Sequence, residues 1–553
     1  MKLTKYLLCG ALAFSLCACG SDNPGESTKH PPGEEPDPNP QPTPGDDDDV
    51  VSPTPGFTLN NRKITIDPTA IYQEMEGFGA SDCWLPNKIG IYWSANRLQI
   101  ARWLFSQNIS SDGQPQGIGL SMWRVNLGAG TEELGAASGI NDENANNRAE
   151  SFLSSSGSYD WKKCAGQQYF MQQAKNNKVE KFVLFSNSPL VQYTKNGQGR
   201  SDEGAYSNLK DDCYGLYAEY MAEVAQHFIS EGYNISHISP VNEPQYNWEG
   251  NSQEGSGWQN SEVARLTREL DDALGKRNLS TSILIGEAAS WEYTYGGNNS
   301  RENTINVFFD PSSESYVGDL PHIEKAIAGH SYWTFDNWRD MRTVRSRVKN
   351  AADAKGIKVW QTEWSMLDKE PSELGGTYDH VSEFDIAQYM SRIIHNDITV
   401  AGCSSWSYWT AMSVERWGQK NRFELIKTTP AGGEYSNDFT AEGNVKATPN
   451  LWVLGNYSLF VRPGYKRVGL TLDESKDFFG TAYMAPDNSR LVIVLTNYDK
   501  ERGVSLDMAA PEGAKSAFTY TTTATKQLKQ ERFNLRDKIF IDPASVTTVV
   551  YNF

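Results

Sequence analysis

Two short stretches, ISPVNEP at residues 238–244 and KVWQTEWS at residues 358–365, carry the most information about the fold. Each is an apolar, strand-like run that delivers one glutamate at its carboxyl end, Glu243 in the first and Glu363 in the second. In a barrel of parallel strands, the groups that do chemistry stand at that end. The two stretches therefore predict that both carboxylates face one cleft.

Eight strand-like runs alternate with amphipathic helical stretches, a pattern that predicts a parallel sheet. The clearest helical stretches cover residues 214–229, 262–274, 338–354 and 384–396. Eightfold alternation matches a (β/α)8 TIM barrel, so the predicted fold class is α/β. The strands are expected at residues 76–83, 119–128, 181–188, 235–242, 282–288, 328–333, 358–364 and 401–409.

The pattern changes after about residue 459, where short alternating runs joined by turn residues predict an antiparallel β-sandwich. A strand-like segment before the barrel is expected to join that sandwich. The expected division of the chain is residues 1–19 as a lipoprotein signal segment, 20–56 as a disordered tether, 57–72 as the joining strand segment, 73–458 as the catalytic barrel and 459–553 as the sandwich.

The N-terminal segment predicts a lipid anchor. Lys2 and Lys5 precede an apolar run that is too short to span a bilayer and fits a signal-peptide core. The run ends in LCAC, which resembles a bacterial lipobox and makes Cys19 the expected lipidated residue; an ordinary signal peptide is the alternative. The Pro-rich and acidic stretch that follows is expected to stay extended, with a reach on the order of 100 Å. We expect the protein at the bacterial cell envelope, anchored to the outer membrane on its surface or periplasmic face.

Composition excludes several function classes. The formal net charge is -18, which argues against a nucleic-acid partner because such partners require basic patches. The cysteines outside the signal segment lack metal-site spacing, and the seven histidines are scattered. We therefore expect no metal and no cofactor.

Two carboxylates facing one cleft are what retaining glycoside hydrolysis requires. We interpret Glu243 as the general acid/base, whose proton is retained by an apolar wall or a negative neighbour, and Glu363 as the nucleophile. Asn242 is expected to hydrogen-bond the sugar 2-hydroxyl. Arg124 and Tyr332 are expected to donate to Glu363 and keep it ionised, although Arg124 could instead form a structural ion pair.

Other polar and aromatic side chains near the strand ends are candidates for substrate binding. His330 is expected to orient a carboxylate or to contact the sugar, with a satisfied core histidine as the alternative. Aromatic rings often line sugar sites, and Trp248 and Trp258 on the segment after Glu243 could wall the cleft, although most aromatics will be core. The remaining substrate-binding candidates are Trp84, Asn187, Trp406 and Trp409.

Five motifs in this order resemble glycoside hydrolase family 30: EGFGASDCW, FSNSPL, VNEP, QTEW and SSWSYW. The resemblance covers roughly residues 57–553. It implies a (β/α)8 barrel with a side β-sandwich, an acid/base at Glu243 and a nucleophile at Glu363. The closest likeness is to the endo-β-1,6-galactanase-like branch. Family members often have a second Pro and a Trp in the third-strand loop. Here Leu190 and Val191 follow Pro189, and Tyr193 is the candidate to replace the aromatic residue, so specificity is open there.

The resemblance implies a retaining hydrolase that acts on a polysaccharide or oligosaccharide, with β-1,6-galactan side chains of arabinogalactan as the expected substrate. A β-1,6-glucanase, a xylanase and an exo-acting β-glycosidase are alternatives within the family. A non-catalytic glycan-binding surface lipoprotein is the alternative class, although the presence of both glutamates speaks against it. We expect a monomer whose only contact with a membrane is its N-terminal lipid.

Overall fold

The computed structural model describes residues 56–553 except 368–369, 376–379 and 417. Eight parallel strands form a closed barrel in the order β10-β3-β4-β5-β6-β7-β8-β9. This confirms the predicted fold class. The barrel strands are β3 (Gly77–Ser81), β4 (Met122–Asn126), β5 (Lys181–Phe185), β6 (Ile235–Ser239), β7 (Ser282–Ala288), β8 (Ile323–His330), β9 (Lys358–Glu363) and β10 (Cys403–Tyr408).

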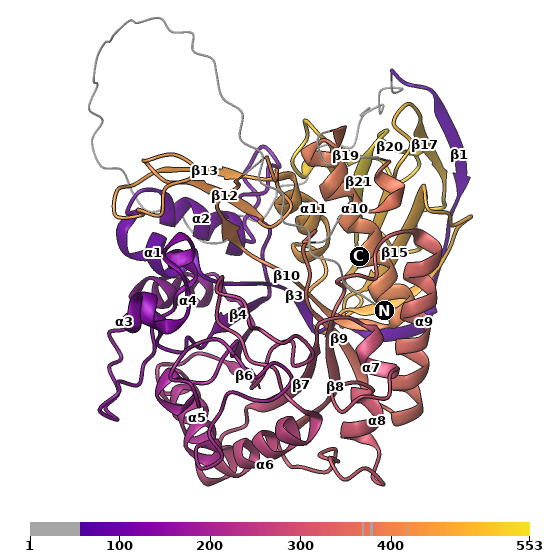
Figure 1. The fold of residues 1–553 in the computed structure, drawn as a ribbon. Helices are drawn as coiled ribbons and strands as arrows, with labels where there is room; N and C mark the ends of the chain where they lie inside the picture. The colour runs from indigo at the N-terminus through magenta and orange to yellow at the C-terminus, as the bar shows by residue number, and fades with distance from the viewer. Residues whose placement is uncertain (1–55, 368–369, 376–379, 417) are drawn as a thin grey trace, which may run out of the picture. The chain divides into compact units, whose positions relative to one another are not determined.

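Helices cover the outside of this barrel (Figure 1). The long helix α9 begins after Asn337, whose side chain accepts a hydrogen bond from the Asp340 N–H, and ends at Gly356 in the left-handed region. The helices are α1 (Leu85–Tyr92), α2 (Asn96–Phe105), α3 (Thr131–Leu134), α4 (Ala165–Asn176), α5 (Tyr214–Ser230), α6 (Asn260–Lys276), α7 (Glu292–Tyr295), α8 (Thr304–Phe309), α9 (Trp338–Lys355), α10 (Glu383–Asn396) and α11 (Pro449–Ser458).

The alternation of side chains along each strand separates two cores. A small inner cluster contains Met122, Val183, Leu284 and Trp360. The neighbouring side chain Trp123 instead joins the larger core that contains helix residues and packs edge-on against Phe105. Because successive side chains of a strand point to opposite faces, Arg124 lies on the same face as Met122, inside the barrel.

The C-terminal region forms two further sheets. A seven-stranded sheet has the order β19-β18-β21-β16-β15-β14-β2, and a three-stranded sheet has the order β1-β17-β20. A hydrophobic cluster that includes Val468, Ile493 and Leu506 draws on both sheets. The strands are β1 (Leu59–Lys63), β2 (Thr65–Glu74), β14 (Lys466–Thr471), β15 (Phe478–Met484), β16 (Arg490–Asn497), β17 (Gly503–Asp507), β18 (Ser516–Thr522), β19 (Lys529–Phe533), β20 (Ile539–Ile541) and β21 (Ser545–Asn552).

The first two strands of the described chain belong to these C-terminal sheets. Strand β1 pairs in parallel with β17, with Leu59 opposite Gly503, and β2 pairs antiparallel with β14. Sandwich residues such as Tyr483 and Val550 also belong to the hydrophobic core of the barrel. A small separate sheet contains β11 (Met412–Ser413), β12 (Ile426–Thr429) and β13 (Asn444–Ala447).

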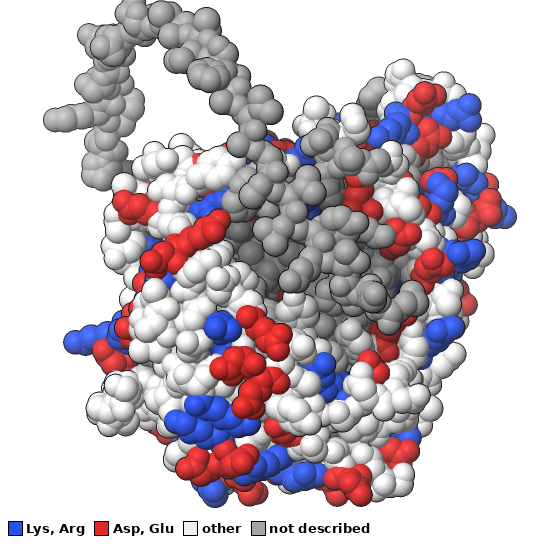
Figure 2. All heavy atoms as spheres, viewed as in Figure 1, with Lys and Arg blue, Asp and Glu red and all other residues white. Residues whose placement is uncertain are grey.

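The surface of the described residues carries charges of both signs. On the face drawn in Figure 2, red acidic and blue basic side chains are interspersed over the white surface. No helix among the described residues has the length and apolar character to cross a bilayer. The predictions for Cys19 and for the tether fall on residues 1–55, which lie outside the described part of the chain.

Candidate active site

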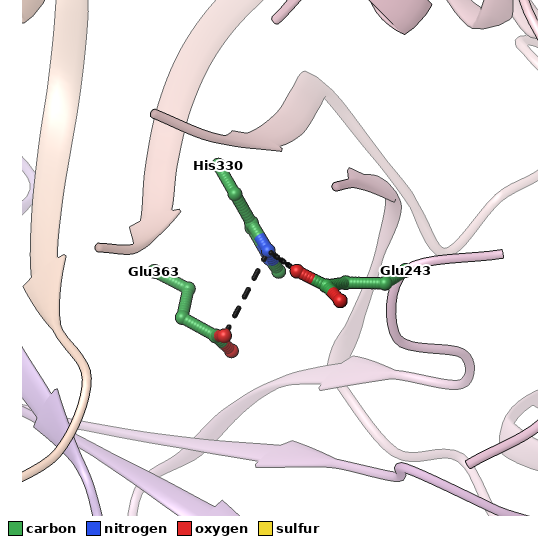
Figure 3. A group of neighbouring side chains, drawn as sticks. All are labelled: Glu243, His330 and Glu363. Atoms are coloured by element: carbon green, nitrogen blue, oxygen red, sulfur yellow. Dashed lines mark hydrogen bonds and ion pairs between the residues drawn. The ribbon is translucent and has the colours of Figure 1, made fainter. Parts of the chain in front are cut away.

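The carboxyl ends of the barrel strands bring the two predicted glutamates together. Glu363 is the last residue of β9, and Glu243 lies four residues after the end of β6. Both are buried, with exposed fractions of 4 % and 7 %. One carboxylate oxygen of each lies within 4.8 Å of the other and of a ring nitrogen of His330 (Figure 3).

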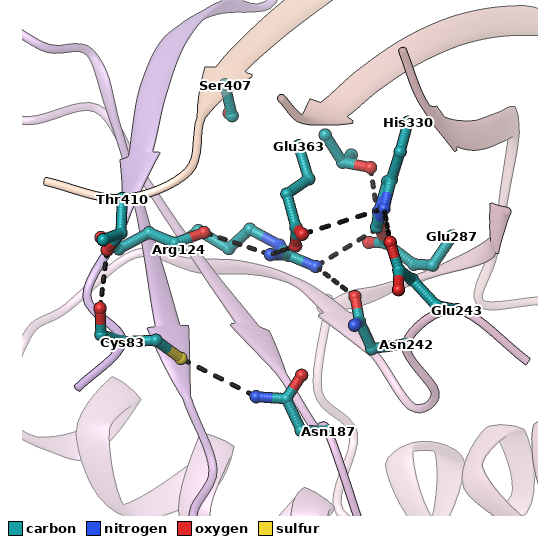
Figure 4. Close-up of polar contacts among 12 residues, drawn as sticks. Cys83, Arg124, Asn187, Asn242, Glu243, Glu287, His330, Glu363, Ser407 and Thr410 are labelled. Carbon is teal, nitrogen blue, oxygen red and sulfur yellow. Dashed lines mark hydrogen bonds and ion pairs between the residues drawn. The ribbon is translucent and has the colours of Figure 1, made fainter. Parts of the chain in front are cut away.

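Arg124 and Tyr332 donate to the two oxygens of Glu363. Arg124 Nη1 lies 2.7 Å from Oε2, and the Tyr332 hydroxyl lies 3.1 Å from Oε1. The other guanidinium nitrogen, Nη2, donates to Asn242 Oδ1 at 3.0 Å (Figure 4). The Arg124 guanidinium also lies 3.6 Å from the ring centroid of Phe185. These contacts hold the Glu363 carboxylate in one orientation and stabilise its ionised form.

His330 contacts the carboxylate of Glu243. Its Nδ1 lies 2.8 Å from Glu243 Oε1 and 3.8 Å from Glu363 Oε1, so the ring stands beside both glutamates (Figure 3). The Glu243 backbone has a positive φ of 43°, and its N–H donates to the carbonyl of Glu287 at 3.0 Å. Non-glycine residues with such a φ are uncommon and cluster at functional sites.

Glu287 is a third buried carboxylate that the sequence analysis missed. It is fully buried on β7 and accepts from His330 Nε2 at 2.9 Å and from Arg124 Nη2 at 3.3 Å. The hydroxyls of Thr362 and Ser239 donate to it at 2.6 Å and 2.8 Å. The available signal was a glutamate near the end of the apolar run SILIGEA, on the strand between the two that deliver Glu243 and His330.

The charges in this cluster determine the pKa values of its members. Burial alone would raise the pKa of Glu287, but the charge of Arg124 and the contact with His330 lower it to about 2. Burial alone would lower the pKa of His330, but the charge of Glu363 and the hydrogen bonds to Glu243 and Glu287 raise it to about 10. At neutral pH His330 is therefore an imidazolium that donates from both nitrogens, and Glu287 is its permanent counter-ion.

Burial and neighbouring charges act in opposite directions on the pKa of Glu363. Burial raises its pKa above that of a free glutamate, and the charges of Glu243 and Glu287 add to the rise, while His330 and Arg124 oppose it. Arg124 is paired directly with Glu363, which stabilises the ionised form of this carboxylate.

The three side chains Glu243, His330 and Glu363 are also close enough to hold a metal ion. A ring that carries a proton on both nitrogens cannot act as a metal ligand. Both ring nitrogens of His330 already contact carboxylates, Nδ1 that of Glu243 at 2.8 Å and Nε2 that of Glu287 at 2.9 Å. The cluster is therefore better suited to proton transfer than to metal binding.

Aromatic and amide side chains lie next to the charged cluster. Trp84 and Trp409 pack edge to face with ring centroids 5.4 Å apart, in a small cluster with Phe185 and Cys83. Trp84 is partly exposed and Trp409 is 8 % exposed. Asn187 donates to Asn126 at 3.2 Å and approaches the Cys83 sulfur at 3.7 Å (Figure 4).

The structure places Trp406 differently from the expectation of a cleft position. The side chain is fully buried and its indole N–H donates to Asp397 Oδ2 at 2.9 Å, in the layer between barrel and helices. A ring with no exposed face cannot stack on a sugar. Trp258 is also buried, whereas Trp248 is partly exposed and donates to the Glu243 carbonyl at 3.2 Å.

Comparison with known proteins identifies the family. The model of O-Glycosyl hydrolase family 30 matches residues 61–420, which include the whole barrel up to β10 and both glutamates. The chain belongs to O-glycosyl hydrolase family 30. The enzyme class is thus a glycoside hydrolase, in agreement with the two buried carboxylates.

Individual relatives of this family 30 hydrolase extend the comparison. An endo-beta-1,6-galactanase of Hypocrea rufa is 26% identical over 470 residues, which cover 82% of this chain and 85% of the relative. The crystal structure of a conserved exported protein from Bacteroides fragilis is 30% identical, with a TM-score of 0.81, covering 89% of this chain and 100% of that one. A xylanase C catalytic domain from Talaromyces cellulolyticus shares the fold at a TM-score of 0.62 and 18% identity, covering 89% and 100%.

Proposed function

We propose that this protein is a retaining endo-β-1,6-galactanase that cuts the galactan side chains of arabinogalactan. The observation that carries the mechanism is the approach of Glu243 and Glu363 to within 4.8 Å through their carboxylate oxygens, with His330 between them. Retaining hydrolases hold their carboxyl groups about 5–5.5 Å apart, and inverting ones about 6.5–9.5 Å. The galactan substrate is supported by the likeness to the galactanase of Hypocrea rufa.

The reaction proceeds in two displacements. Glu363 attacks the anomeric carbon, while Glu243 gives its proton to the departing glycosidic oxygen, so that a glycosyl ester of Glu363 forms. Water then attacks the same carbon, its proton passes to Glu243, and the Glu363 carboxylate leaves. His330 occupies Glu243 Oε1, which leaves Oε2 to carry the transferred proton. Asn242, held by Arg124, is positioned to contact the sugar beside Glu243.

The charged cluster suits this cycle because its total charge stays constant. In the free enzyme Arg124 and His330 are positive, Glu287 and Glu363 are negative, and Glu243 is neutral. In the ester intermediate Glu363 is neutral and Glu243 is negative, so the cluster is again neutral overall. One negative charge moves between two carboxylates that flank the same imidazolium. A buried site that keeps its net charge avoids the desolvation cost of an unpaired ion.

Digestion of debranched β-1,6-galactan, with the products separated by size, tests the proposal. Short oligosaccharides released from the start, with the β configuration at the new reducing end, would support it. Single galactose units alone would refute the endo mode. Cleavage of β-1,6-glucan or xylan but not of galactan would refute galactan as the substrate and leave the two-glutamate mechanism intact. An initial α product would refute retention.

For its location, we propose that the protein is a lipoprotein anchored through Cys19 to the outer membrane. The support is the lipobox-like LCAC and the Pro-rich, acidic stretch that follows it. Replacement of Cys19 by Ser should move the protein from the membrane fraction to the soluble fraction without changing its activity. Retention in the membrane fraction would refute Cys19 as the anchor.

A further inference from the structure

A second cavity, of about 360 Å³, lies at the amino ends of the barrel strands, away from the two catalytic glutamates. Its lining combines the start of β9 and the segment that leads into β10 with the end of the sandwich strand β2. Lys358 in this lining and Glu363 are the first and last residues of β9, which at about 3.3 Å per residue lie about 16 Å apart. We name this space the basal cavity; its lining includes Ile71, Tyr72, Gln73, Lys349, Lys358 and Arg467.

Two large side chains at the basal cavity are exposed. Ile71 is 58% exposed and Tyr72 is 53% exposed. Both belong to β2, which is the last strand of the seven-stranded sheet and pairs there with β14 alone. Large apolar side chains that stay exposed at a concave site mark a binding surface, because they gain from being covered.

Arg467 is held firmly at this cavity. Its Cζ lies 3.8 Å from the ring centroid of Tyr72, and its Nε donates to Gln73 Oε1 at 2.9 Å. The Gln73 amide donates in turn to the carbonyls of Ile398 and Cys403 at 2.7 Å and 3.0 Å. The guanidinium is therefore fixed by the sandwich on one side and, through Gln73, by the barrel on the other.

This guanidinium lacks a counter-ion. Within the described part of the chain, Arg467 forms no ion pair with a carboxylate, and its two Nη atoms have no hydrogen-bond acceptor. The two lysines of the lining differ, because Lys349 Nζ lies 2.6 Å from Asp353 Oδ2 and Lys358 Nζ lies 2.5 Å from Glu76 Oε1. Burial lowers the pKa of Arg467 below its ordinary value, as expected for a desolvated cation. A bound anion would supply the missing partner.

We infer that the basal cavity binds a uronic acid unit of a polysaccharide, with the sugar carboxylate on the Nη atoms of Arg467 and the sugar ring against Ile71 and Tyr72. The planar fork of a guanidinium matches a carboxylate through two parallel hydrogen bonds. The exposed apolar side chains cover the C–H face of the ring, and the cavity volume falls in the range of about 300–1,000 Å³ that small ligands occupy.

This second site goes beyond the proposed function, from which it takes only the polymeric nature of the ligand. An acidic unit held at the amino ends of the strands would keep a polysaccharide on the enzyme while neutral units enter the catalytic cleft. The site itself needs neither Glu243 nor Glu363, so its occupation can be measured without turnover.

Calorimetric titration of the full chain at low salt tests the assignment. The probes are methyl β-D-glucuronide and its neutral counterpart, methyl β-D-glucoside. We expect the glucuronide to bind at one site about tenfold more tightly than the glucoside, because only the glucuronide can form the charged, two-pronged contact with Arg467. Sodium acetate should bind more weakly than the glucuronide, because it offers the carboxylate without the ring.

Variants of Arg467 locate the binding. Arg467→Gln should weaken glucuronide binding about tenfold and leave glucoside binding unchanged. Arg467→Lys keeps the charge without the fork and should give an intermediate affinity. The control is Arg62→Gln on the sandwich strand β1: Arg62 also lies near a ring, 5.8 Å from the centroid of Phe478, but it is already paired with Asp473 at 3.1 Å. An unchanged thermal unfolding midpoint shows that each variant is folded.

Several results would overturn the assignment. These are equal affinities for glucuronide and glucoside, an acetate affinity equal to that of the glucuronide, undiminished glucuronide binding in both Arg467 variants, and an equal loss in Arg62→Gln. Competitive inhibition of galactan cleavage by the glucuronide, of the same strength in wild type and Arg467→Gln, would place the ligand in the catalytic cleft and also overturn it. Failure to cleave galactan would refute the proposed substrate and leave this site intact, because the titrations do not use turnover.

Discussion

Replacement of Glu287 by Gln tests whether the buried ion cluster exists as described. Glu287 is fully buried and its pKa is lowered from the 4.5 of a free glutamate to about 2. At about 1.4 kcal/mol per pKa unit, this difference corresponds to about 3 kcal/mol of folding free energy at pH 7. The same magnitude, about 3–5 kcal/mol, is typical when one partner of a buried ion pair is removed.

The pH dependence has a definite sign. A carboxylate whose pKa is lowered by folding contributes stability that is fully present above the unfolded pKa of about 4.5 and is lost as the pH falls through about 2. The gap in unfolding free energy between wild type and Glu287→Gln should therefore shrink by about half between pH 7 and pH 3. Urea unfolding, followed by tryptophan fluorescence at pH 7 and pH 3, measures this difference in unfolding free energy.

The control for this experiment is an ion pair of similar length at the surface. Lys349 Nζ and Asp353 Oδ2 lie 2.6 Å apart, but their side chains are 43% and 58% exposed. Asp353→Asn should cost less than about 0.5 kcal/mol, because water and salt screen exposed pairs. If Glu287→Gln destabilises the protein no more than Asp353→Asn does, Glu287 is not the ionised partner of Arg124 and His330.

Three further outcomes follow from the same site. Glu363→Gln should nearly abolish turnover of every substrate. Glu243→Gln should slow the hydrolysis of ordinary glycosides by a factor of about 10²–10⁴ and spare substrates with good leaving groups. Equal losses on both substrate types for Glu243→Gln would contradict its assignment as the general acid. Arg124→Lys should lower kcat through loss of the two-sided contact with Glu363 and Asn242, and unchanged steady-state rates would contradict it. Folding raises the pKa of His330, so the stability advantage of wild type over His330→Asn should be complete below pH 6.5 and disappear as the pH rises through about 10. Urea unfolding at pH 6 and pH 10 measures this advantage. An advantage that does not depend on pH would contradict the assignment of His330 as an imidazolium.

The barrel strands were predictable because each is an apolar run with turn residues around it. Strand β8 is the informative exception: it begins at Ile323, five residues before the predicted start at residue 328. The second residue of this strand is Glu324, whose carboxylate oxygen Oε2 lies 3.4 Å from His237 Nε2. A charged residue paired with a side chain of β6, two strands away in the barrel, interrupts the apolar pattern, and the sequence alone does not show the partner.

The site was predictable where a motif placed one polar residue at a strand end, as for Glu243 and Glu363. It was not predictable where orientation decides the role. Trp406 alternates with Ser405 and Ser407, which approach Met122 inside the barrel, so its ring points outward to Asp397. Glu287 follows Gly286 at a φ of 107° and itself has a φ of 39°. The sequence shows a glutamate near the end of the apolar run SILIGEA, but it does not show that this backbone conformation brings the carboxylate to His330.

The pairing of β1 with β17 has a consequence for the order of folding during synthesis. Leu59 and its partner Gly503 are 444 positions apart, and ribosomes add about 5–20 residues per second. Strand β1 therefore waits roughly 20–90 seconds for its neighbour, longer than the elementary steps of helix and hairpin formation. Until β17 is made, the backbone groups of β1 lack their native hydrogen-bond partners, and a chain that stops before Gly503 would leave β1 as an unprotected edge open to pairing with other chains.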